Sequence, residues 1–545
     1  MIYRRVIQGL LFTFLGFVLI AAVQGPFLNE DSEKIHLNKG FFETGSLWLK
    51  LSQPEAGYES SYFRPVNNVV LTGLARAFGV ESAAPFRMAG SLAFMCAIFA
   101  LIVMARRLNL SVTTAWVCAA FFAFHPFNSW FYFQGAWFGN SLALVLMIVS
   151  WFVYEYSLND VSSNDWFWGL TLLGLVYAAG LCKDSAILVV GAMLPLVFSG
   201  QRSVPARRWF LWGMMLVGAL LLLWHRFNVL RPDPRFTKID IGYGLSHSGW
   251  LLLNYLWMML SATNFNYGRN VPQGPGWPLT IFLLGVFFFV LWRLRRRPVE
   301  AALWWCCGVF ALESVIASFP SFWILPTRVE FLIAAIVLFA AKFWQGSRLR
   351  NHRYFSRPVQ KTLVVAALIW FLLPSAGQVF LSRNEQVFYA YHNETPYSWK
   401  LLYVEGRLHL KNEEWELAED RFQKSLVLHQ TTVIYNSLGL ALLRQGRYGE
   451  SIHNFIEALC MNPWKESAAV NLAEALLRSA LPLNDGADFW KSMERVPERA
   501  TIFNNLGVLF AKKGDFEKAN IFFRQALRVD PSFPPAKHNL LFLSN

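Results

Sequence analysis

Long apolar runs follow one another through the first 381 residues of the chain. A helix that crosses a bilayer needs about 20 mostly apolar residues, and fewer where it is locally short or buried in a bundle. The pattern predicts eleven such helices: 6–27, 84–105, 112–128, 135–156, 166–181, 184–199, 208–226, 278–293, 299–319, 326–345 and 361–381. The first run is longer than the apolar core of a signal peptide, so we expect it to remain as an anchor.

The positions of Lys and Arg predict how these helices are oriented. Residues 1–381 contain 30 Lys and Arg against 16 Asp and Glu, whereas residues 382–545 contain 19 of each, so the whole net charge of +14 lies in the first part. With the amino terminus inside, the inner segments carry 17 basic residues; they are 1–5, 106–111, 157–165, 200–208, 292–298 and 342–361. The short outer turns near 129–134 and 320–325 carry none. This asymmetry reports membrane orientation and argues against nucleic-acid binding.

Two long segments are predicted on the outer side, 28–83 and 227–277. Within the second, residues 250–262 are apolar but too short to cross alone. A span there would also place the Arg-rich segment 293–297 on the wrong side. We therefore predict a helix that lies on the outer surface or re-enters it.

The residues after 381 repeat themselves with a period of 34, the tetratricopeptide spacing. Following a linker at 382–398, the pattern predicts four helical hairpins and a terminal helix within 399–545; the repeats are 399–431, 432–465, 466–499 and 500–533. The last repeat has Phe503, Gly507, Phe523, Ala526 and Pro531, and Tyr435, Gly439, Phe455, Ala458 and Pro463 stand 68 residues earlier. Small residues let paired helices approach, aromatic rings fill the gap, and Pro ends the second helix.

The predicted fold class is therefore all-α: a polytopic helix bundle followed by an α-solenoid. We expect the solenoid to be a right-handed superhelix whose concave face accepts an extended peptide. The six cysteines form no CxxC pair, and five of them lie in or beside apolar segments, so neither a disulfide framework nor a zinc site is expected. Nucleotide-binding and metalloprotease motifs are also absent, and no bound cofactor or metal is predicted.

Ionisable residues near the predicted outer face are the candidates for chemistry. Glu30 and Asp31 follow the first helix, either as a solvated interface cluster or as carboxylates at a cavity, where a like-charged neighbour tunes one as a base. Arg64 precedes Pro65, either as a loop residue that binds carbonyls or as a clamp for a lipid phosphate.

Three further positions are candidates. Lys183 and Asp184 interrupt two apolar runs, either as an ion pair at a turn or as functional groups, because ionisable residues at such depth are costly. His125 and Pro126 end the third helix, where a capping turn explains them without function. Arg328 begins the tenth helix with Glu330, as an ion pair or as a phosphate-binding residue.

The order of these landmarks resembles the GT-C glycosyltransferases. The match is to an acidic pair after helix one, an aromatic-Arg-Pro, a His-Pro after helix three, a Lys-acid between helices five and six, and outward tetratricopeptide repeats. Within GT-C, the chain resembles the transmembrane and tetratricopeptide-repeat-containing O-mannosyltransferases and their bacterial relatives.

The resemblance implies an inverting transfer of a sugar from a polyprenyl-phosphate donor to a protein or other hydroxyl acceptor. Glu30 and Asp31 match the acidic pair that would deprotonate the acceptor, and Arg64 and Lys183 match basic positions that would hold the lipid-linked phosphate. Asp184, His125 and Arg328 complete the expected binding set. The implied location is a bacterial inner membrane, with the repeats in the periplasm binding the acceptor or a partner.

The chain also departs from the family pattern. The family has an acid, an Arg and an Asp where this chain has Trp130, Phe138 and Asn140, and its acidic pair reads Asp-Asp. These changes are compatible with a different sugar, a different acceptor or lost activity. The main alternative is a non-catalytic membrane-anchored scaffold whose repeats recruit envelope proteins. A transporter of lipid-linked intermediates is a third hypothesis, but the internal symmetry expected of a transporter is not evident.

Overall fold

The computed structural model of the chain forms two compact units. The amino-terminal unit comprises Met1–Phe265 and Arg269–Tyr391, and the repeat unit comprises Asn266–Gly268 and His392–Asn545. The structure describes residues 2–25, 46–50, 64–80, 82–125, 128, 138–159, 164–195, 205–229, 253, 269–270, 277–316, 323–324, 330–346, 356–384, 399–428, 430–461, 466–479 and 487–544.

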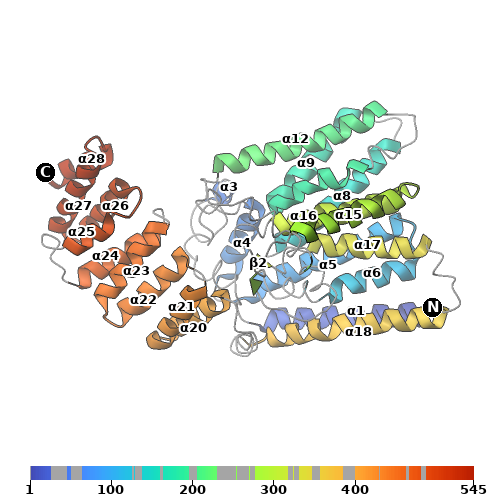
Figure 1. Cartoon of the computed structure of the whole chain (residues 1–545), viewed down its shortest axis with the longest axis horizontal. Helices are drawn as coiled ribbons and strands as arrows, with labels where there is room; N and C mark the ends of the chain where they lie inside the picture. Colours follow the sequence, from blue (N-terminus) through green and yellow to red (C-terminus); the bar gives the residue numbers. More distant parts are fainter. Residues whose placement is uncertain are drawn as a thin grey trace. The chain divides into compact units, whose positions relative to one another are not determined.

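Apolar helices make up the amino-terminal unit (Figure 1). Six are long and apolar enough to cross a membrane: α1 (Ile2–Gln24), α5 (Ala84–Arg107), α8 (Phe138–Asn159), α9 (Asp165–Cys182), α12 (Pro205–Val229) and α18 (Arg357–Leu381). The other four apolar helices are α6 (Val112–Phe124), α15 (Trp277–Arg293), α16 (Pro298–Ile316) and α17 (Glu330–Gly346). These ten helices fall on ten of the predicted spans.

The sixth predicted span, 184–199, is not one continuous helix in its described part. It begins as a 3₁₀ helix, η4 (Asp184–Leu188), and continues as the short α10 (Val189–Ala192). Pro195 has no N–H to donate to the carbonyl of Gly191, and the Nε1 of Trp305 donates to that oxygen instead, at 2.9 Å. Trp212 Nε1 donates to the Val190 carbonyl at 2.9 Å. Side chains of α12 and α16 thus supply hydrogen bonds to two carbonyls of the broken helix. The prediction of eleven spans is not confirmed.

Large apolar side chains point outward along many of these helices. Phe12, Phe99, Leu220 and Phe282 are each more than half exposed. Exposed apolar surface on this scale marks a region that lies against other apolar groups. The outward faces of the amino-terminal unit are therefore compatible with insertion into a membrane.

Glycines at the crossing let α9 and α12 pack closely; the two helices run side by side in Figure 1. A Cβ atom at Gly218 would lie 2.6 Å from the Leu173 carbonyl oxygen, and one at Gly169 would lie 2.9 Å from Met214 Cγ. Small residues at such crossings let two backbones approach, as is typical of helices in membranes.

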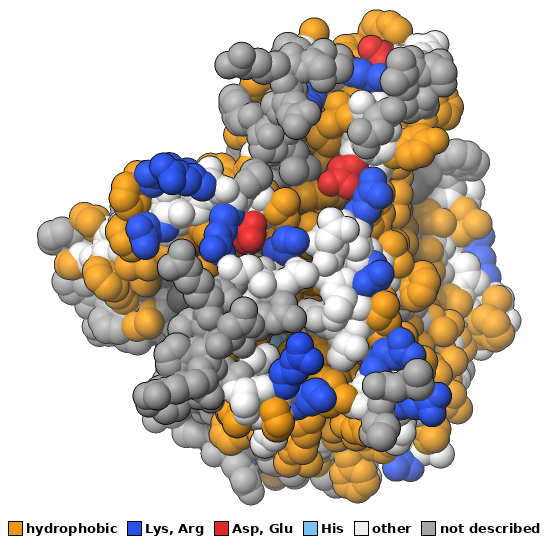
Figure 2. All heavy atoms as spheres, turned by 90° about the vertical axis from the view of Figure 1, so that its right-hand side faces the viewer, with side chains coloured by type: hydrophobic (Ala, Val, Ile, Leu, Met, Phe, Trp, Pro, Cys, Tyr) orange, Lys and Arg blue, Asp and Glu red, His pale blue; other side chains and the backbone are white. Residues whose placement is uncertain are grey.

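The predicted inner segments lie together at one end of the amino-terminal unit. Lys342 Nζ donates to the Leu108 carbonyl at 2.8 Å, and Arg207 forms an ion pair with Asp165 at 2.9 Å. Arg107 pairs with Glu155 at 3.1 Å, and the Lys361 ammonium lies 5.8 Å from the ring centre of Tyr3. Figure 2 views the unit from the side of its amino terminus and shows many Lys and Arg side chains and few acids. The basic segments therefore lie together at this end.

Helices outside the spans complete the amino-terminal unit. The predicted outer segment 28–83 contains α3 (Leu47–Lys50) and α4 (Pro65–Phe78), neither of which the hydrophobic pattern predicted. A two-residue antiparallel pair joins β1 (Arg269–Asn270) to β2 (Trp323–Ile324). It brings two predicted outer loops together. The predicted surface helix at 250–262 lies outside the described residues, apart from Leu253.

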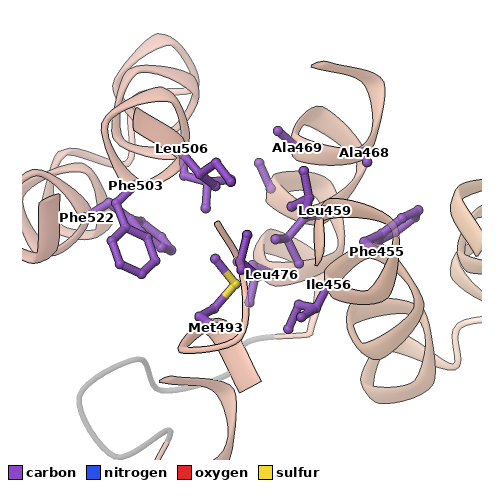
Figure 3. Close-up of a cluster of buried hydrophobic side chains, with 14 of the residues drawn as sticks. Phe455, Ile456, Leu459, Ala468, Ala469, Leu476, Met493, Phe503, Leu506 and Phe522 are labelled. Atoms are coloured by element: carbon purple, nitrogen blue, oxygen red, sulfur yellow. The ribbon is translucent and has the colours of Figure 1, made fainter. Parts of the chain in front are cut away.

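Paired helices make up the repeat unit. The helices are α20 (Trp399–Lys411), α21 (Trp415–Leu428), α22 (Thr432–Arg444), α23 (Tyr448–Met461), α24 (Glu466–Arg478), α25 (Ala487–Met493), α26 (Arg499–Lys512), α27 (Phe516–Val529) and α28 (Pro534–Ser544). A continuous apolar core from Leu443 to Ala536 joins the last three repeats (Figure 3).

The predicted packing of small residues against aromatic rings recurs in three hairpins. A Cβ atom at Gly406, Gly439 or Gly507 would lie within 2.7 Å of the ring of Phe422, Phe455 or Phe523 respectively. Each ring lies 16 residues after its glycine and is almost completely buried. Only a glycine permits this approach. The third repeat has no such pair, and its second helix, α25, is only seven residues long.

We predict that Gly507→Leu destabilises the last hairpin by about 2 kcal/mol, because the new side chain collides with the buried Phe523 ring. Hydrogen exchange of the α26 and α27 amides in the full-length protein should become about thirtyfold faster. Gly449→Leu is the matched control, since this helical glycine is exposed and has nothing within 4 Å of its Cβ position. Equal exchange in the two variants would show that this packing is unimportant.

Candidate functional site

Buried polar side chains collect at the end of the amino-terminal unit opposite the basic segments. We call this set the polar cluster; it comprises Lys50, Arg64, Asn67, Asn68, Thr72, Arg87, Ser91, His125, Asn128, Asn140, Ser141, Lys183, Ser375, Gln378 and Ser382, each at most 5% exposed. Burial of so many polar groups is expensive unless they are paired or serve a function. The cluster is therefore the candidate site.

Helix α4 supplies one wall of the polar cluster. Arg64 stands at its amino-terminal cap and Pro65 at its first turn, which suits the fixed φ of proline. The spacing of Arg64, Asn68 and Thr72 puts all three on one face, and Leu71 on that side packs with Phe86 and Phe138 of neighbouring helices. This apolar contact holds the polar face of α4 against the ends of α5 and α8.

Lys50 lies beside this helix. The Nδ2 of Asn68 donates to the Lys50 carbonyl at 3.4 Å. Burial, followed by repulsion from Arg76, lowers the pKa of the Lys50 ammonium below its usual value.

Gly139 marks the point where α4, α8 and α9 meet. A Cβ atom here would overlap Asn67 Oδ1 and would lie 2.8 Å from the Cys182 carbonyl oxygen. The residues that flank this contact are Asn140 on α8 and Lys183 at the end of α9. Two positions far apart in the sequence are thereby brought to one place.

Lys183 belongs to the polar cluster and also contacts the apolar interior. It is the carboxy-terminal cap of α9, with an extended backbone (φ −151°, ψ 117°), and its side chain is buried. Its Nζ lies 4.3 Å from the ring centre of Phe331, a cation–π contact. Asp184 begins η4 directly after it.

Phe331 also lines a cavity between α5, α8, α10, α16 and α17. All the lining residues are apolar and include Met104, Met147, Leu303 and Phe310. An apolar lining of this kind suits apolar ligands. Phe331 therefore contacts a buried cation and also lines an apolar cavity.

His125 caps α6 with an extended backbone, as the His-Pro turn predicts. Its ring stacks on Phe371 of α18, with ring centres 5.1 Å apart. Ser375, one turn further along α18, donates to the Phe124 carbonyl at 2.8 Å. These contacts fasten α6 to α18 and give His125 a structural role.

Arg87 is a fully buried cation that the sequence reasoning missed, although it lies inside a predicted span. Its guanidinium donates to the carbonyl and hydroxyl oxygens of Ser382, at 3.1 and 3.0 Å. A Cβ atom at Gly25 would overlap the same guanidinium. Arg87 therefore joins the start of α5 to the ends of α1 and α18. Its signal was available, because an ionisable residue within an apolar helix is rare.

The predicted site residues are only partly described. Arg64, His125 and Lys183 all lie in the polar cluster, with Asp184 next to Lys183, so the structure brings these positions to one end of the bundle. Glu30, Asp31, Arg328 and Trp130 lie outside the described residues. Of the two other departures, Phe138 packs against α4, and Asn140 belongs to the cluster. Their catalytic and binding roles stay predictions.

Pairs of asparagines join successive repeats in the second unit. Asn471 Nδ2 donates to Asn436 Oδ1 at 3.1 Å, and Asn539 Nδ2 donates to Asn504 Oδ1 at 2.9 Å. Asn436, Asn471 and Asn504 lie on the first helices of their hairpins, and Asn539 lies on the terminal helix α28. The two residues of each pair are 35 positions apart in the sequence, close to the 34-residue period of the repeats.

Comparison with protein families matches residues 403–460 and 500–533 to models described as tetratricopeptide repeat. These stretches are tetratricopeptide repeats. The array agrees with the predicted spacing and suggests a protein or peptide partner. No curated protein matches the chain.

Several solved structures resemble the chain weakly. They include YrrB, titled a TPR protein with an unusual peptide-binding site, at 22% identity over 31% of this chain and 88% of that one, with a TM-score of 0.20. Others are the APC/C hetero-tetramer Cut9-Hcn1 (12% identity, 75% and 85% covered, TM-score 0.20) and yeast Tom70 (10%, 82% and 95%, 0.16). At TM-scores this low the likenesses carry no argument about function.

We predict that Gly25→Ala lowers the thermal stability of the detergent-solubilised protein by displacing the Arg87 guanidinium. Each hydrogen bond from a charged group contributes about 1.5–3 kcal/mol, so loss of the bonds to Ser382 costs about 2 kcal/mol or more. Arg87→Met should act in the same direction. Gly16→Ala, in the same helix with nothing within 4 Å of its Cβ position, should leave the melting temperature unchanged. A melting temperature equally insensitive to Gly25→Ala would refute the clamp.

Proposed function

We propose that the protein is a membrane glycosyltransferase that moves a sugar from a polyprenyl-phosphate donor to a hydroxyl group of a protein acceptor. The observation that carries the proposal is the position of Lys183, which borders the polar cluster on one side and, through Phe331, an apolar cavity on the other. A lipid phosphate needs both a cation and an apolar chamber. The resemblance to GT-C enzymes supports the same conclusion.

The phosphate of the donor would be held by Lys183 and Arg64. Both are buried, so their attraction for an anion is weakened less by water than on an open surface. Arg supplies a planar fork that matches phosphate oxygens, whereas Lys supplies a compact charge. As the sugar leaves, negative charge grows on the phosphate, and the two cations stabilise it.

The base would be Asp31, with Glu30 as the second choice. Gly25, at the end of α1, contacts Arg87 in the polar cluster, and Asp31 follows it by six residues, which span about 20 Å at most. The proposed function requires the acidic pair to lie near Arg64 and Lys183. A hydroxyl is a poor nucleophile at neutral pH, so transfer needs a positioned base.

The reaction would be a single displacement. The carboxylate takes the proton of the acceptor hydroxyl, and the hydroxyl oxygen forms a bond to the anomeric carbon of the sugar. The bond from that carbon to the phosphate oxygen breaks, and polyprenyl phosphate leaves with the electron pair. The configuration is inverted, with no covalent enzyme intermediate.

The repeat unit would bind the acceptor or a partner. The amides of Asn436 and Asn504 and their partners lie at regular intervals, as do the carbonyl and N–H groups of an extended peptide. The repeats equally suit a non-catalytic scaffold, because the family matches cover this unit alone. A variant that still inserts into the membrane but no longer transfers the glycan would distinguish the enzyme from the non-catalytic scaffold.

For topology we predict that the chain ends lie on opposite sides of a bacterial inner membrane, with the basic end of the bundle in the cytoplasm. A reporter active only in the cytoplasm, fused after Ser382, should be inactive. The same reporter fused at Arg107, in the basic end, is the control and should be active. Strong activity after Ser382 would mean that the number of spans is even.

For catalysis we predict that Asp31→Asn reduces sugar transfer about a hundredfold or more, because a general base contributes about 10²–10⁴-fold. Glycan profiles of envelope proteins and lipids, compared between cells carrying each variant, measure the effect, and Glu30→Gln is tested in parallel. Glu33→Gln is the matched control from the same acidic segment and should transfer normally.

Two results would contradict this assignment. Normal transfer by both Asp31→Asn and Glu30→Gln would exclude the acidic pair as the base. Identical glycan profiles with and without the intact gene would replace the enzyme with the scaffold.

A further inference from the structure

The amide of Asn140 is a buried polar group whose atoms have no hydrogen-bond partner in the described part of the chain. The side chain is 0% exposed, and both Nδ2 and Oδ1 are left unbonded. Thr72 on α4 is likewise 0% exposed, and its hydroxyl has no partner among the described residues. A buried amide or hydroxyl normally finds a partner, so each such exception needs an explanation.

These two groups come from helices that meet. Gly139, which precedes Asn140, leaves no room for a Cβ atom between α8, the Asn67 side chain of α4 and the Cys182 carbonyl of α9. Thr72 lies on the same buried face of α4 as Asn68, one turn along. Lys183 follows Cys182 directly. Asn140 thus follows the residue of α8 that contacts α9, and Lys183 follows the residue of α9 at the same contact.

We propose that Asn140 and Thr72 form a subsite for the uncharged hydroxyl groups of the donor sugar. This inference rests on the proposed function and names the part of the donor that α4 and α8 recognise. The geometry suits it, because a sugar linked to a phosphate at Lys183 must lie beside that phosphate. Asn67, at the junction of α4 and α8, borders the same subsite.

The chemistry of the side chains selects a neutral sugar. An amide offers two donors and one acceptor, and a threonine hydroxyl offers one donor and two acceptor lone pairs. A sugar hydroxyl is also both donor and acceptor, so either group pairs with it without a net charge. A carboxylate at position 140 would favour a cation or compete for Lys183. The amide and the threonine hydroxyl therefore suit the hydroxyl groups of an uncharged hexose.

A binding role and a structural role predict opposite effects on the ligand-free protein. If Asn140 holds the fold together, its replacement by Leu lowers the melting temperature. If Asn140 forms hydrogen bonds only with a bound ligand, its amide destabilises the ligand-free protein, because an unpaired buried polar group is destabilising. Replacement by an apolar group of similar size then leaves the melting temperature unchanged or raises it. Thr72→Val makes the same comparison on α4.

The experiment uses the full-length protein in lipid nanodiscs. Affinities are measured for undecaprenyl phosphate and for undecaprenyl-phosphate glucose, mannose and galactose, together with melting temperatures without lipid. We expect at least one hexose-bearing lipid to bind more tightly than the bare lipid phosphate. Asn140→Leu and Thr72→Val should each weaken that lipid about three- to tenfold, as expected for a lost hydrogen bond, and leave undecaprenyl phosphate unchanged.

Two control variants accompany these measurements. Ser157→Ala changes a buried residue at the other end of α8, where the hydroxyl bonds to the Tyr154 carbonyl, and should alter neither affinity. Lys183→Met should weaken the bare and the hexose-bearing lipids alike.

The possible failures are distinguishable. Equal affinity of the wild-type protein for bare and hexose-bearing lipids would overturn the sugar subsite but keep the lipid-phosphate site. A lower melting temperature for ligand-free Asn140→Leu, with equal weakening of both lipids, would show that the amide is structural. If the wild-type protein binds neither lipid above phosphatidylglycerol, the proposed function is wrong and the subsite with it.

Discussion

An apolar environment, in which no water bonds to the backbone, is the constraint on which the amino-terminal unit depends. A backbone carbonyl that loses its helical partner there must find another within the protein. The break near Pro195 meets this requirement through the indole N–H groups of Trp212 and Trp305, which bond to the carbonyls of Val190 and Gly191. Without these two side chains, α10 would present unpaired carbonyls to an apolar interior.

The charged side chains at the two ends of the amino-terminal unit have different surroundings. At the basic end, Arg107 and Arg207 have acidic partners and lie at the surface or near it. At the other end, Arg64, Arg87 and Lys183 are buried, and Arg87 bonds to the backbone and hydroxyl oxygens of Ser382. Basic residues at the first end fit the orientation rule. The buried cations at the second end include the two residues that the proposed function assigns to the donor phosphate.

The sequence predicted the helices of both units because their signals are local. Apolar runs marked ten of the helices, and the spacing of Gly439 and Gly507 marked the repeats, since each glycine lies against a ring in its own hairpin. Non-local arrangements were not predictable. The break near Pro195 depends on indoles of α12 and α16. Helix α4 mixes Asn and Thr with apolar residues over too short a stretch to stand out. The partner of Arg87 was not predictable because it lies 295 residues away.

The junction at Phe331 limits the kind of ligand that the polar cluster can serve. A soluble phosphate compound would use the cations and leave the cavity below Phe331 empty, and a neutral lipid would fill the cavity without engaging Arg64 or Lys183. An amphiphile with an anionic head and an apolar tail would use both, and a neutral group on its head would use Asn140 and Thr72 as well. Under the proposed function, side chains placed by α4, α8, α9 and α17 would therefore serve the three chemical parts of a lipid-linked sugar.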